Sequence, residues 1–305
     1  MKRIFAAAAL ASSVMAMPAA ARTTYVDIQY RQVSGTRPFI PARLGQTTLL
    51  MMVHSGAGFY MMTNHEHAKA IGLKDLQDAG KYGITSVGHV SPLGRVRAVL
   101  PSLVIGGKEV KNAPLLVFET PQDPPMDGML GLGWLNANKV LLDFDKNRVG
   151  IPDTSDDTTA GDRELEARGY VGHKMIRGKD GYYVNGTVNG APARISINTV
   201  MNNVIEAAFA KRSGIQLGPV VDEAGGPKGA VLPVRISKYQ LDVAIDGQTT
   251  APTQPLSWDT AAYHSEAAGS AEDDLQLGSE FMLANQAVID FGSETLFLPR
   301  RPSRP

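Results

Sequence analysis

The side chains best suited to chemistry in this sequence are six histidines and a few acids, because the chain has no cysteine and so no thiolate ligand, disulfide or cysteine nucleophile. Two histidines stand close together in Asn64-His65-Glu66-His67, which superficially resembles a metal site. Residues two apart on a helix point in different directions, so we expect that His65 and His67 do not share one ion. We expect Thr63 or Asn64 to cap a helix there, with Glu66 in its first turn.

The remaining patterns predict no other reaction centre. A site that combines His54 with His89 is an alternative metal pairing, and it requires the segment around His89 to fold over a cleft. Ser55 is adjacent to His54, but neighbours on a strand face opposite ways, so the pair does not indicate a Ser-His-Asp triad. Neither a G-x-S-x-G turn nor a dinucleotide-binding glycine pattern occurs. The sequence therefore predicts no metal and no cofactor.

Charge and composition restrict the partners. The 305 residues include 30 basic and 30 acidic side chains, which gives a formal charge of zero. Binding phosphates needs a basic excess, so this balance argues against a nucleic-acid partner. Aromatic residues make up 7% of the chain, which disfavours an aromatic stacking platform. The hydrophobic content of 43% is enough for a substantial core, and the length suggests two domains of ordinary size.

The first 21 residues have the features of a cleavable signal peptide. A positive start at residues 1–3 precedes an alanine-rich apolar run at 4–17, and small residues at 19–21 suit a cleavage site. The run is shorter than the ~20 apolar residues that a bilayer span needs. We therefore expect cleavage after Ala21, a periplasmic or secreted location, and no membrane span.

The rest of the chain has the pattern of a mostly β protein. Asn-Gly, Asp-Gly and Gly-Gly pairs recur between short apolar runs, which is typical of strands joined by tight hairpins. Helical patterns are few and short. The stretch 152–163 (PDTSDDTTAGDR) is acidic and lacks large apolar residues, as solvated linkers do. We predict an all-β chain with minor α content, in which an acidic linker at 153–168 joins an N-terminal lobe (22–152) to a C-terminal lobe (169–305).

The two predicted lobes repeat each other in sequence. Two runs in the first half recur 147 residues later without a gap: MLGLGWL (129–135) and VLLDF (140–144) match QLGSEFM (276–282) and AVIDF (287–291). An earlier block, VHSG at 53–56, matches INTV at 197–200 at an offset of 144, and each of the two is followed by an apolar helical pattern that ends in glycine. This period is far longer than a solenoid repeat, so the pattern indicates a duplicated domain.

With these blocks in order, the sequence resembles the retropepsin-like aspartic proteases in a tandem, pepsin-like two-lobed form. In that family each lobe carries apolar-apolar-Asp-Thr/Ser-Gly-Ala, a helix such as ALAKRLGL, an apolar-apolar-Gly segment and a hairpin such as VIDFGSRTLYL. Residues 287–298 (AVIDFGSETLFL) and 207–215 (AAFAKRSGI) are close matches, and the resemblance covers nearly all of 23–300. It implies two β-barrel lobes related by a pseudo-twofold axis, a cleft between them, and a monomer, since the lobes are fused.

The positions of the family's two catalytic acids are occupied by His54 and Asn198. Aspartic proteolysis needs two carboxylates about 3 Å apart that share one proton. Asn198 has no titratable proton, and His54 alone lacks the partner that would share one. We therefore expect no proteolysis by the family's mechanism.

Residues around these positions are the candidates for contact with a ligand. The resemblance implies that Ser55 and Thr199 keep the hydroxyls that bond across between the two loops. Gly56 is kept, but its counterpart is Val200, so the second loop has lost a residue that allows close backbone approach. The segment 82–88 (YGITSVG) takes the place of the family's flap hairpin. The cleft candidates are Ser55, Gly56, Thr199, Val200, Tyr82 and Thr85.

Two further features near the cleft have plain structural interpretations. The symmetric acid pairs Asp143/Asp290 and Asp127/Asp274 stand where the family also has Asp besides its catalytic acids, so we expect them to cap short helices or close hairpins. The methionines that bracket the first loop, at 51–52 and 61–62, are expected to fill the core, with an adaptable floor under a peptide cleft as the alternative.

The leading functional hypothesis is an exported, catalytically inactive relative of the aspartic proteases that binds an extended peptide or protein segment in the inter-lobe cleft by strand addition. The alternative is a peptidase or esterase-like hydrolase in which His54 acts as the base and Asn198 polarises a carbonyl. A third possibility is a structural module of the cell envelope whose cleft is a relic.

Overall fold

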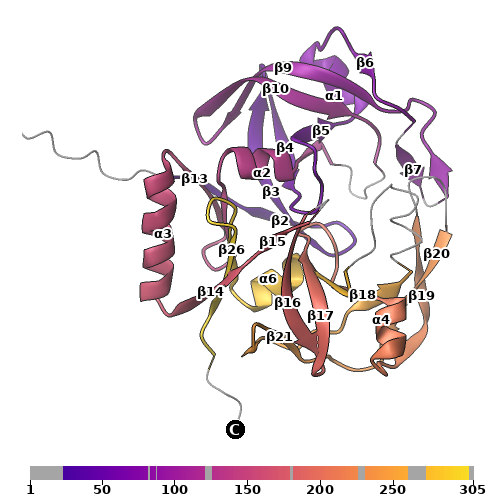
Figure 1. Ribbon diagram of the computed structural model, residues 1–305. Helices are drawn as coiled ribbons and strands as arrows, with labels where there is room; N and C mark the ends of the chain where they lie inside the picture. The colour runs from indigo at the N-terminus through magenta and orange to yellow at the C-terminus, as the bar shows by residue number, and fades with distance from the viewer. Residues whose placement is uncertain are drawn as a thin grey trace, which may run out of the picture.

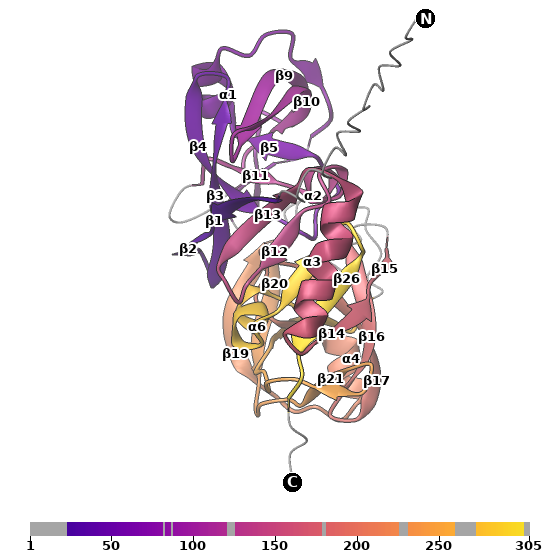
Figure 2. The same cartoon turned by 90° about the vertical axis from the view of Figure 1, so that its left-hand side faces the viewer.

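The computed structural model describes residues 23–81, 83–86, 88–120, 126–178, 181–225, 231–259 and 273–301. These residues form two β-rich lobes that meet at a shared six-stranded sheet (Figures 1 and 2). Short helices follow the pattern that the sequence predicts, and one longer helix, α3 (Ser155–Ala167), covers the shared sheet. Within the described ranges no helix is both long enough and apolar enough to cross a membrane.

The first lobe is an eight-stranded sheet with a two-stranded hairpin beside it. Its strands are β2 (Gln29–Gln32), β3 (Thr36–Leu44), β4 (Thr47–Val53), β5 (Met61–Thr63), β6 (Gln77–Asp78), β9 (Val96–Ile105), β10 (Lys108–Val117) and β11 (Gly128–Leu130), and the hairpin is β7 (Ile84–Ser86) with β8 (His89–Val90). Its helices are α1 (His65–Ile71) and α2 (Leu132–Ala137).

The second lobe is a ten-stranded sheet with two short helices. Its strands are β15 (Ile176–Arg177), β16 (Tyr182–Val188), β17 (Ala191–Ile197), β18 (Val204–Glu206), β19 (Leu217–Gly225), β20 (Val231–Ser237), β21 (Val243–Ile245), β22 (Gln248–Thr249), β23 (Leu256–Trp258) and β24 (Leu275–Leu277). Its helices are α4 (Ala207–Arg212) and α6 (Ser279–Ala284).

Both lobes use the same strand pairings at equivalent places. In the first lobe β11 lies parallel to β4 and antiparallel to β5. In the second lobe β24 lies parallel to β17 and antiparallel to β18. A parallel neighbour then extends each arrangement, with β10 beside β5 and β23 beside β18. The sequence repeat is therefore a repeat of architecture, and it places the ends of β4 and β17 at equivalent positions.

The shared sheet joins the two repeats edge to edge. It contains β1 (Thr23–Asp27), β12 (Leu141–Asp143), β13 (Arg148–Pro152), β14 (Tyr170–Lys174), β25 (Val288–Asp290) and β26 (Thr295–Pro299). Its central pair is β12 with β25, in which Leu142 lies opposite Ile289. Both side chains are at most 1% exposed, so the pairing of the two repeated segments is also a continuous apolar core.

The acidic stretch at 153–168, expected as a solvated linker, instead contains the whole of α3 (Ser155–Ala167). Thr154 caps this helix, because its hydroxyl accepts a hydrogen bond from the Asp157 N–H (3.3 Å) and its own N–H donates to the Asp157 carboxylate (2.8 Å). Leu165 anchors the helix in a small core with Val288 and Phe297 of the shared sheet. The acidic composition led to the wrong prediction because this helix is stabilised by a capping box and packs through few apolar residues.

The sequence predicted that the symmetric acids cap short helices or close hairpins, but the bonds of Asp127 and Asp274 join neighbouring strands instead. Asp127 accepts the N–H of Leu50 (2.8 Å), and Asp274 accepts the N–H of Arg194 (2.9 Å) at the equivalent place in the second lobe. These bonds join β4, which precedes the His54 loop, and β17, which precedes the Asn198 loop, to the segments that lead into β11 and β24.

The second pair of acids closes the two hairpins of the shared sheet. Asp143 accepts the N–H of Lys146 (2.9 Å), and Asp290 accepts the N–H groups of Gly292 (2.6 Å) and Ser293 (3.0 Å).

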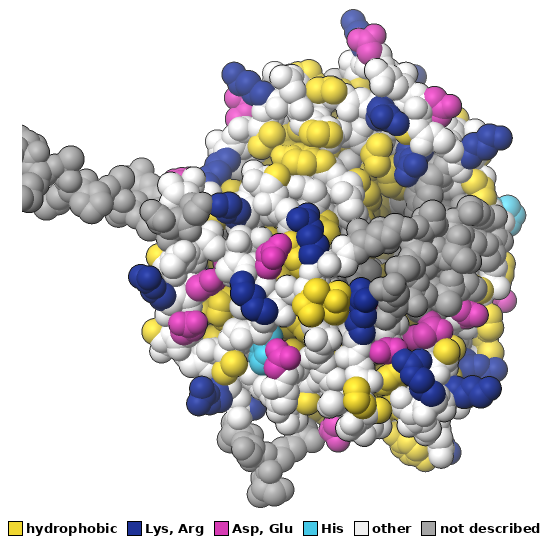
Figure 3. Space-filling view, in the orientation of Figure 1, with side chains coloured by type: hydrophobic (Ala, Val, Ile, Leu, Met, Phe, Trp, Pro, Cys, Tyr) yellow, Lys and Arg dark blue, Asp and Glu magenta, His cyan; other side chains and the backbone are white. Residues whose placement is uncertain are grey.

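On the face shown in Figure 3, the described basic and acidic side chains are interspersed rather than gathered by sign. The prediction that nucleic acid is not a partner stays a prediction.

The two members of the second pair differ in one respect, because Asp290 faces another acid. The carboxyl groups of Asp162, in α3, and Asp290 share a hydrogen bond, and Asp290 is 2% exposed. Burial raises the pKa of Asp290 to about 7, with help from the negative charge of Asp162 and against the stabilising backbone donors. Burial also raises the pKa of Asp162. The pair therefore holds a proton at mildly acidic pH.

We expect the free energy of unfolding to respond to this pair. A folded-state pKa above the unfolded value of about 3.9 gives stability that is present at low pH and is lost as pH rises towards 7. Asp290→Asn imitates the protonated form, so we expect it to match the wild type near pH 4 and to exceed its stability at pH 7.5 by on the order of 2 kcal/mol. Urea unfolding at the two pH values measures this.

Asp143→Asn is the matched control, because Asp143 holds the equivalent hairpin but pairs with Arg148 (3.3 Å) instead of another acid. We expect Asp143→Asn to destabilise the protein at pH 7.5. Equal effects of the two substitutions at pH 7.5 would contradict the shared proton.

Candidate functional site at the junction of the lobes

Two loops, one from each lobe, are joined by four hydrogen bonds that come in equivalent pairs. The Ser55 N–H donates to the Thr199 hydroxyl (3.0 Å), and the Thr199 N–H donates to the Ser55 hydroxyl (3.0 Å). The Ser55 hydroxyl donates to the carbonyl of Ile197 (3.0 Å), and the Thr199 hydroxyl donates to the carbonyl of Val53 (2.6 Å). Ser55 and Thr199 are 1% and 0% exposed. Each hydroxyl therefore accepts from one backbone N–H of the other lobe and donates to one backbone carbonyl of that lobe.

The strands place the residue before each hydroxyl in the same way. His54 follows β4 and donates its N–H to the carbonyl of Leu130 (2.8 Å), and Asn198 follows β17 and donates its N–H to the carbonyl of Leu277 (3.0 Å). The backbone at Gly278 lies so close to the Asn198 loop that only glycine fits there, because a Cβ would collide with the Met201 carbonyl. Gly131 has the equivalent constraint in the first lobe. The apolar-Gly segments of the sequence repeat thus hold the two loops in register.

His54 and Asn198 meet around one glycine. The N–H of Gly56 donates to Nδ1 of His54 (3.1 Å), and a Cβ on Gly56 would lie 2.5 Å from Cγ of Asn198. Oδ1 of Asn198 accepts the N–H of Val200 at 3.4 Å, the counterpart of the Gly56 bond in the other loop. The structure therefore brings together the two positions that the sequence singled out.

The protonation of His54 follows from its surroundings. Burial, with a smaller contribution from the positive charge of Arg37, lowers the pKa of His54 to about 3. The imidazole is therefore neutral at physiological pH. Since Nδ1 accepts the Gly56 N–H, the hydrogen-bond network assigns the proton to Nε2. The ring presents a donor and not a free lone pair.

Asn198 also presents a donor. Its Oδ1 is directed to the Val200 N–H, which leaves the Nδ2 hydrogens as the groups that can bond a ligand. Two neutral donors thus stand at equivalent places, one after β4 and one after β17. Such a pair can bind an acceptor such as a peptide carbonyl, but it cannot take a proton from water.

Sequence reasoning missed Arg37, which lies beside this site. The side chain is 5% exposed and donates to the carbonyls of Ser34 (2.5 Å) and Thr36 (3.1 Å) and to Oδ1 of Asn202 (3.1 Å). Burial lowers the pKa of Arg37 to about 10, and the negative charge of Glu280 opposes that shift. Arg37 therefore links the first lobe to the loop of the second and gives the site a positive neighbour. The only sequence signal is a basic residue within the apolar run 36–44.

The other candidates occupy different environments. The hydroxyls of Ser55 and Thr199 serve to join the loops, and their contact with a ligand stays a prediction. Val200 is partly buried against an apolar cluster of the first lobe that includes Met52 and Met62. Tyr82 lies outside the described residues. Thr85 lies in β7, in a hairpin with β8, and its side-chain contacts are outside the description.

The four methionines that bracket the first loop fill the core, which was the default expectation. Met51, Met52, Met61 and Met62 are each at most 1% exposed. They divide between two apolar clusters, so they support the loop from beneath and do not line its surface.

The histidines near α1 pair with different acids. Nδ1 of His65 lies 3.0 Å from Glu119, whereas Nε2 of His67 lies 3.3 Å from Asp127. Asn64 is the N-cap, as expected, and its side chain accepts the N–H of His67 (2.8 Å). Among the described residues, no three side chains of the metal-ligating types are grouped around one point.

Comparison with known proteins supports the fold. A family model described as aspartyl protease matches residues 40–134, which include the His54 loop. The aspartic proteinase from Irpex lacteus matches 92% of this chain and 97% of its own, with a TM-score of 0.52 and 12% identity. The chain therefore has the two-lobed, mostly β fold of aspartic proteases, as its sequence resemblance implied.

Single-lobe structures match part of the chain. A retropepsin-like aspartic protease from Rickettsia conorii is 23% identical with a TM-score of 0.32, covering 44% of this chain and 93% of its own. The retroviral protease-like domain of Ddi1 from Leishmania major is 23% identical with a TM-score of 0.30, covering 38% and 88%. A search of curated proteins found no match. Since a fold does not establish an activity, the function must be argued from the site.

A double-mutant cycle tests the connection between the loops. Ser55→Ala and Thr199→Val each leave buried groups of the other lobe without a partner, so we expect each to cost about 1–3 kcal/mol of unfolding free energy. The two substitutions break different bonds of one junction. Because either one loosens the same contact between the loops, the double variant should cost less than the sum by about 1 kcal/mol or more. Urea unfolding of the four proteins measures this coupling.

Thr250→Val is the matched control for the cycle. Thr250 is also buried, at 3% exposed, but its hydroxyl donates to Val243 within its own lobe (2.8 Å). Combined with Ser55→Ala, it should be additive. Additive behaviour of Ser55→Ala with Thr199→Val would show that the two hydroxyls act independently.

Proposed function

We propose that this protein binds an extended peptide or protein segment across the His54 and Asn198 loops and does not hydrolyse it. One observation carries the proposal. The bonds that position the two loops are complete, while the two side chains that they position are neutral hydrogen-bond donors.

We expect no hydrolysis because neither side chain can transfer a proton in the way that a general acid or base must. A general acid and a general base need pKa values near the working pH, and they need a proton to give or a lone pair to receive one. Asn198 has neither. His54 holds its Nε2 proton, has its Nδ1 lone pair engaged by Gly56, and has a pKa lowered to about 3. This geometry also removes the support for a hydrolase in which His54 is the base.

Binding follows from what the same two groups can still do. Nε2–H of His54 and the Nδ2 hydrogens of Asn198 can both donate to one carbonyl oxygen of a bound backbone. Gly58, two residues after Gly56 in the first loop, has open space around its Cα, since a Cβ there would have no atom within 4 Å. An extended segment with its own free N–H and C=O groups suits such a site, because main-chain bonds provide affinity without a particular sequence.

The wider biological setting is part of the proposal. We infer that residues 1–21 direct export to the periplasm or the medium, with cleavage after Ala21. The fused lobes supply both loops in one chain, so a monomer suffices to form the site.

Fluorescein-labelled, denatured casein tests the binding proposal. We expect its fluorescence anisotropy to rise with protein concentration and its gel pattern to stay unchanged after prolonged incubation. Gly58→Trp should weaken binding at least tenfold, since the indole would occupy the space over the loop. The matched control is Gly161→Trp, in α3, where a Cβ also meets nothing within 4 Å, and it should bind as the wild type does.

The opposite results would reject the proposal. They are an absence of binding, equal binding by the two tryptophan variants, or cleavage of casein that disappears in His54→Ala.

A further inference from the structure

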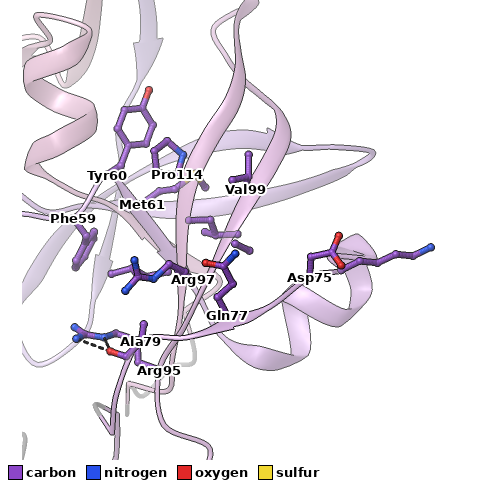
Figure 4. Close-up of a pocket in the computed structure, with 14 residues that line it drawn as sticks. Phe59, Tyr60, Met61, Asp75, Gln77, Ala79, Arg95, Arg97, Val99 and Pro114 are labelled. Carbon is purple, nitrogen blue, oxygen red and sulfur yellow. Dashed lines mark hydrogen bonds between the residues drawn. The ribbon is translucent and has the colours of Figure 1, made fainter.

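A cavity lies in the first lobe, beside the segment 74–79 that leads towards the hairpin β7–β8. It has a volume of about 700 Å³. Four stretches of chain line it: the start of β5, the segment 74–79, the first half of β9 and the end of β10 (Figure 4). Drug-sized ligands occupy cavities of this size, with apolar walls and a few polar groups.

The charged side chains of the cavity are mostly basic. Lys74, Arg95 and Arg97 line it, and Asp75 is the acid among the lining residues. Arg95 is fixed to the backbone, because its Nε and Nη2 donate to the carbonyl of Ala79 (3.1 and 3.0 Å). The cavity thus has a net positive lining in a protein with a formal charge of zero.

Arg97 has no such attachment. Its side chain makes no hydrogen bond or ion pair within the described part of the chain, and in Figure 4 it extends from β9 towards Phe59. Five N–H donors of a guanidinium are therefore available at the wall of a cavity. A carboxylate matches their planar, forked arrangement.

An apolar wall faces these donors. Phe59, Tyr60, Met61 and Leu116 are among the lining residues. The ring of Phe59 also lies edge-on to His54, with 6.0 Å between the ring centroids. One aromatic side chain therefore separates the cavity from the loop that carries His54.

We propose that this cavity binds an organic acid: a carboxylate carried on an aromatic or aliphatic body. Arg97 pairs with the anion, and Phe59 and Tyr60 contact the body. The site does not depend on peptide binding at the loops, since it uses different polar groups.

Two dyes that share one ring system test the proposal. 8-Anilino-1-naphthalenesulfonate carries an anion, and N-phenyl-1-naphthylamine lacks it. Arg97→Gln should raise the dissociation constant of the anionic dye roughly three- to tenfold, the range for a partly exposed ion pair, and leave that of the neutral dye unchanged. Arg163→Gln, an exposed arginine of α3, is the matched control and should change neither.

Gln77→Trp locates the dyes. Gln77 lines the cavity from the exposed strand β6, so an indole there should weaken both dyes without disturbing the core. Equal effects of Arg97→Gln on the two dyes, no effect on either, or no effect of Gln77→Trp would overturn the proposal. Thermal unfolding of each variant confirms that it is folded.

Competition distinguishes the source of the acid. Decanoate displaces the anionic dye if the ligand is a free aliphatic acid, and a short peptide that ends in phenylalanine displaces it if the ligand is a chain terminus. The same peptide with an amidated end should not displace it. If neither acid displaces the dye, the proposal fails.

Discussion

The reciprocal hydrogen bonds between Ser55 and Thr199 are the constraint on which the rest of the structure depends. Both residues are buried, so their N–H groups and hydroxyls have no water to bond and must find partners in the protein. Each finds them in the opposite lobe. Positions 54 and 198 are consequently brought together by their neighbours, whatever side chains they carry.

Because Ser55 and Thr199 position the loops, the side chains at 54 and 198 determine what the site can bind or react with. A shared proton between two carboxylates would make the junction an acid–base centre. His54 and Asn198 are instead neutral donors beside the buried cation Arg37, which favours an electron-rich group such as a backbone carbonyl. Within the described ranges, Asp162 and Asp290 face each other where α3 contacts the shared sheet, and burial raises the pKa of both. The backbone donors to Asp290 lie in the β25–β26 turn.

The sequence could predict whatever the duplication repeats. Matching blocks identified the two loops and the two pairs of acids. Asp143 and Asp290 close hairpins as expected, whereas Asp127 and Asp274 join neighbouring strands at equivalent places. Features of one lobe alone were harder to predict. The capping box of α3 was concealed by an acidic composition, and the contacts of Arg37 and Arg97 depend on chain segments that come together only in the fold.

Placing two acids at positions 54 and 198 tests most directly the claim that the two loops are fully supported and lack only carboxyl groups that could share a proton. The variant His54→Asp/Asn198→Asp/Val200→Gly rebuilds both loops, and its cleavage of denatured casein can be compared with that of the wild type between pH 3 and pH 7. We predict cleavage by the folded variant that increases towards acidic pH, and none by the wild type. Cleavage by the wild type, or a folded variant that remains inert, would contradict the account.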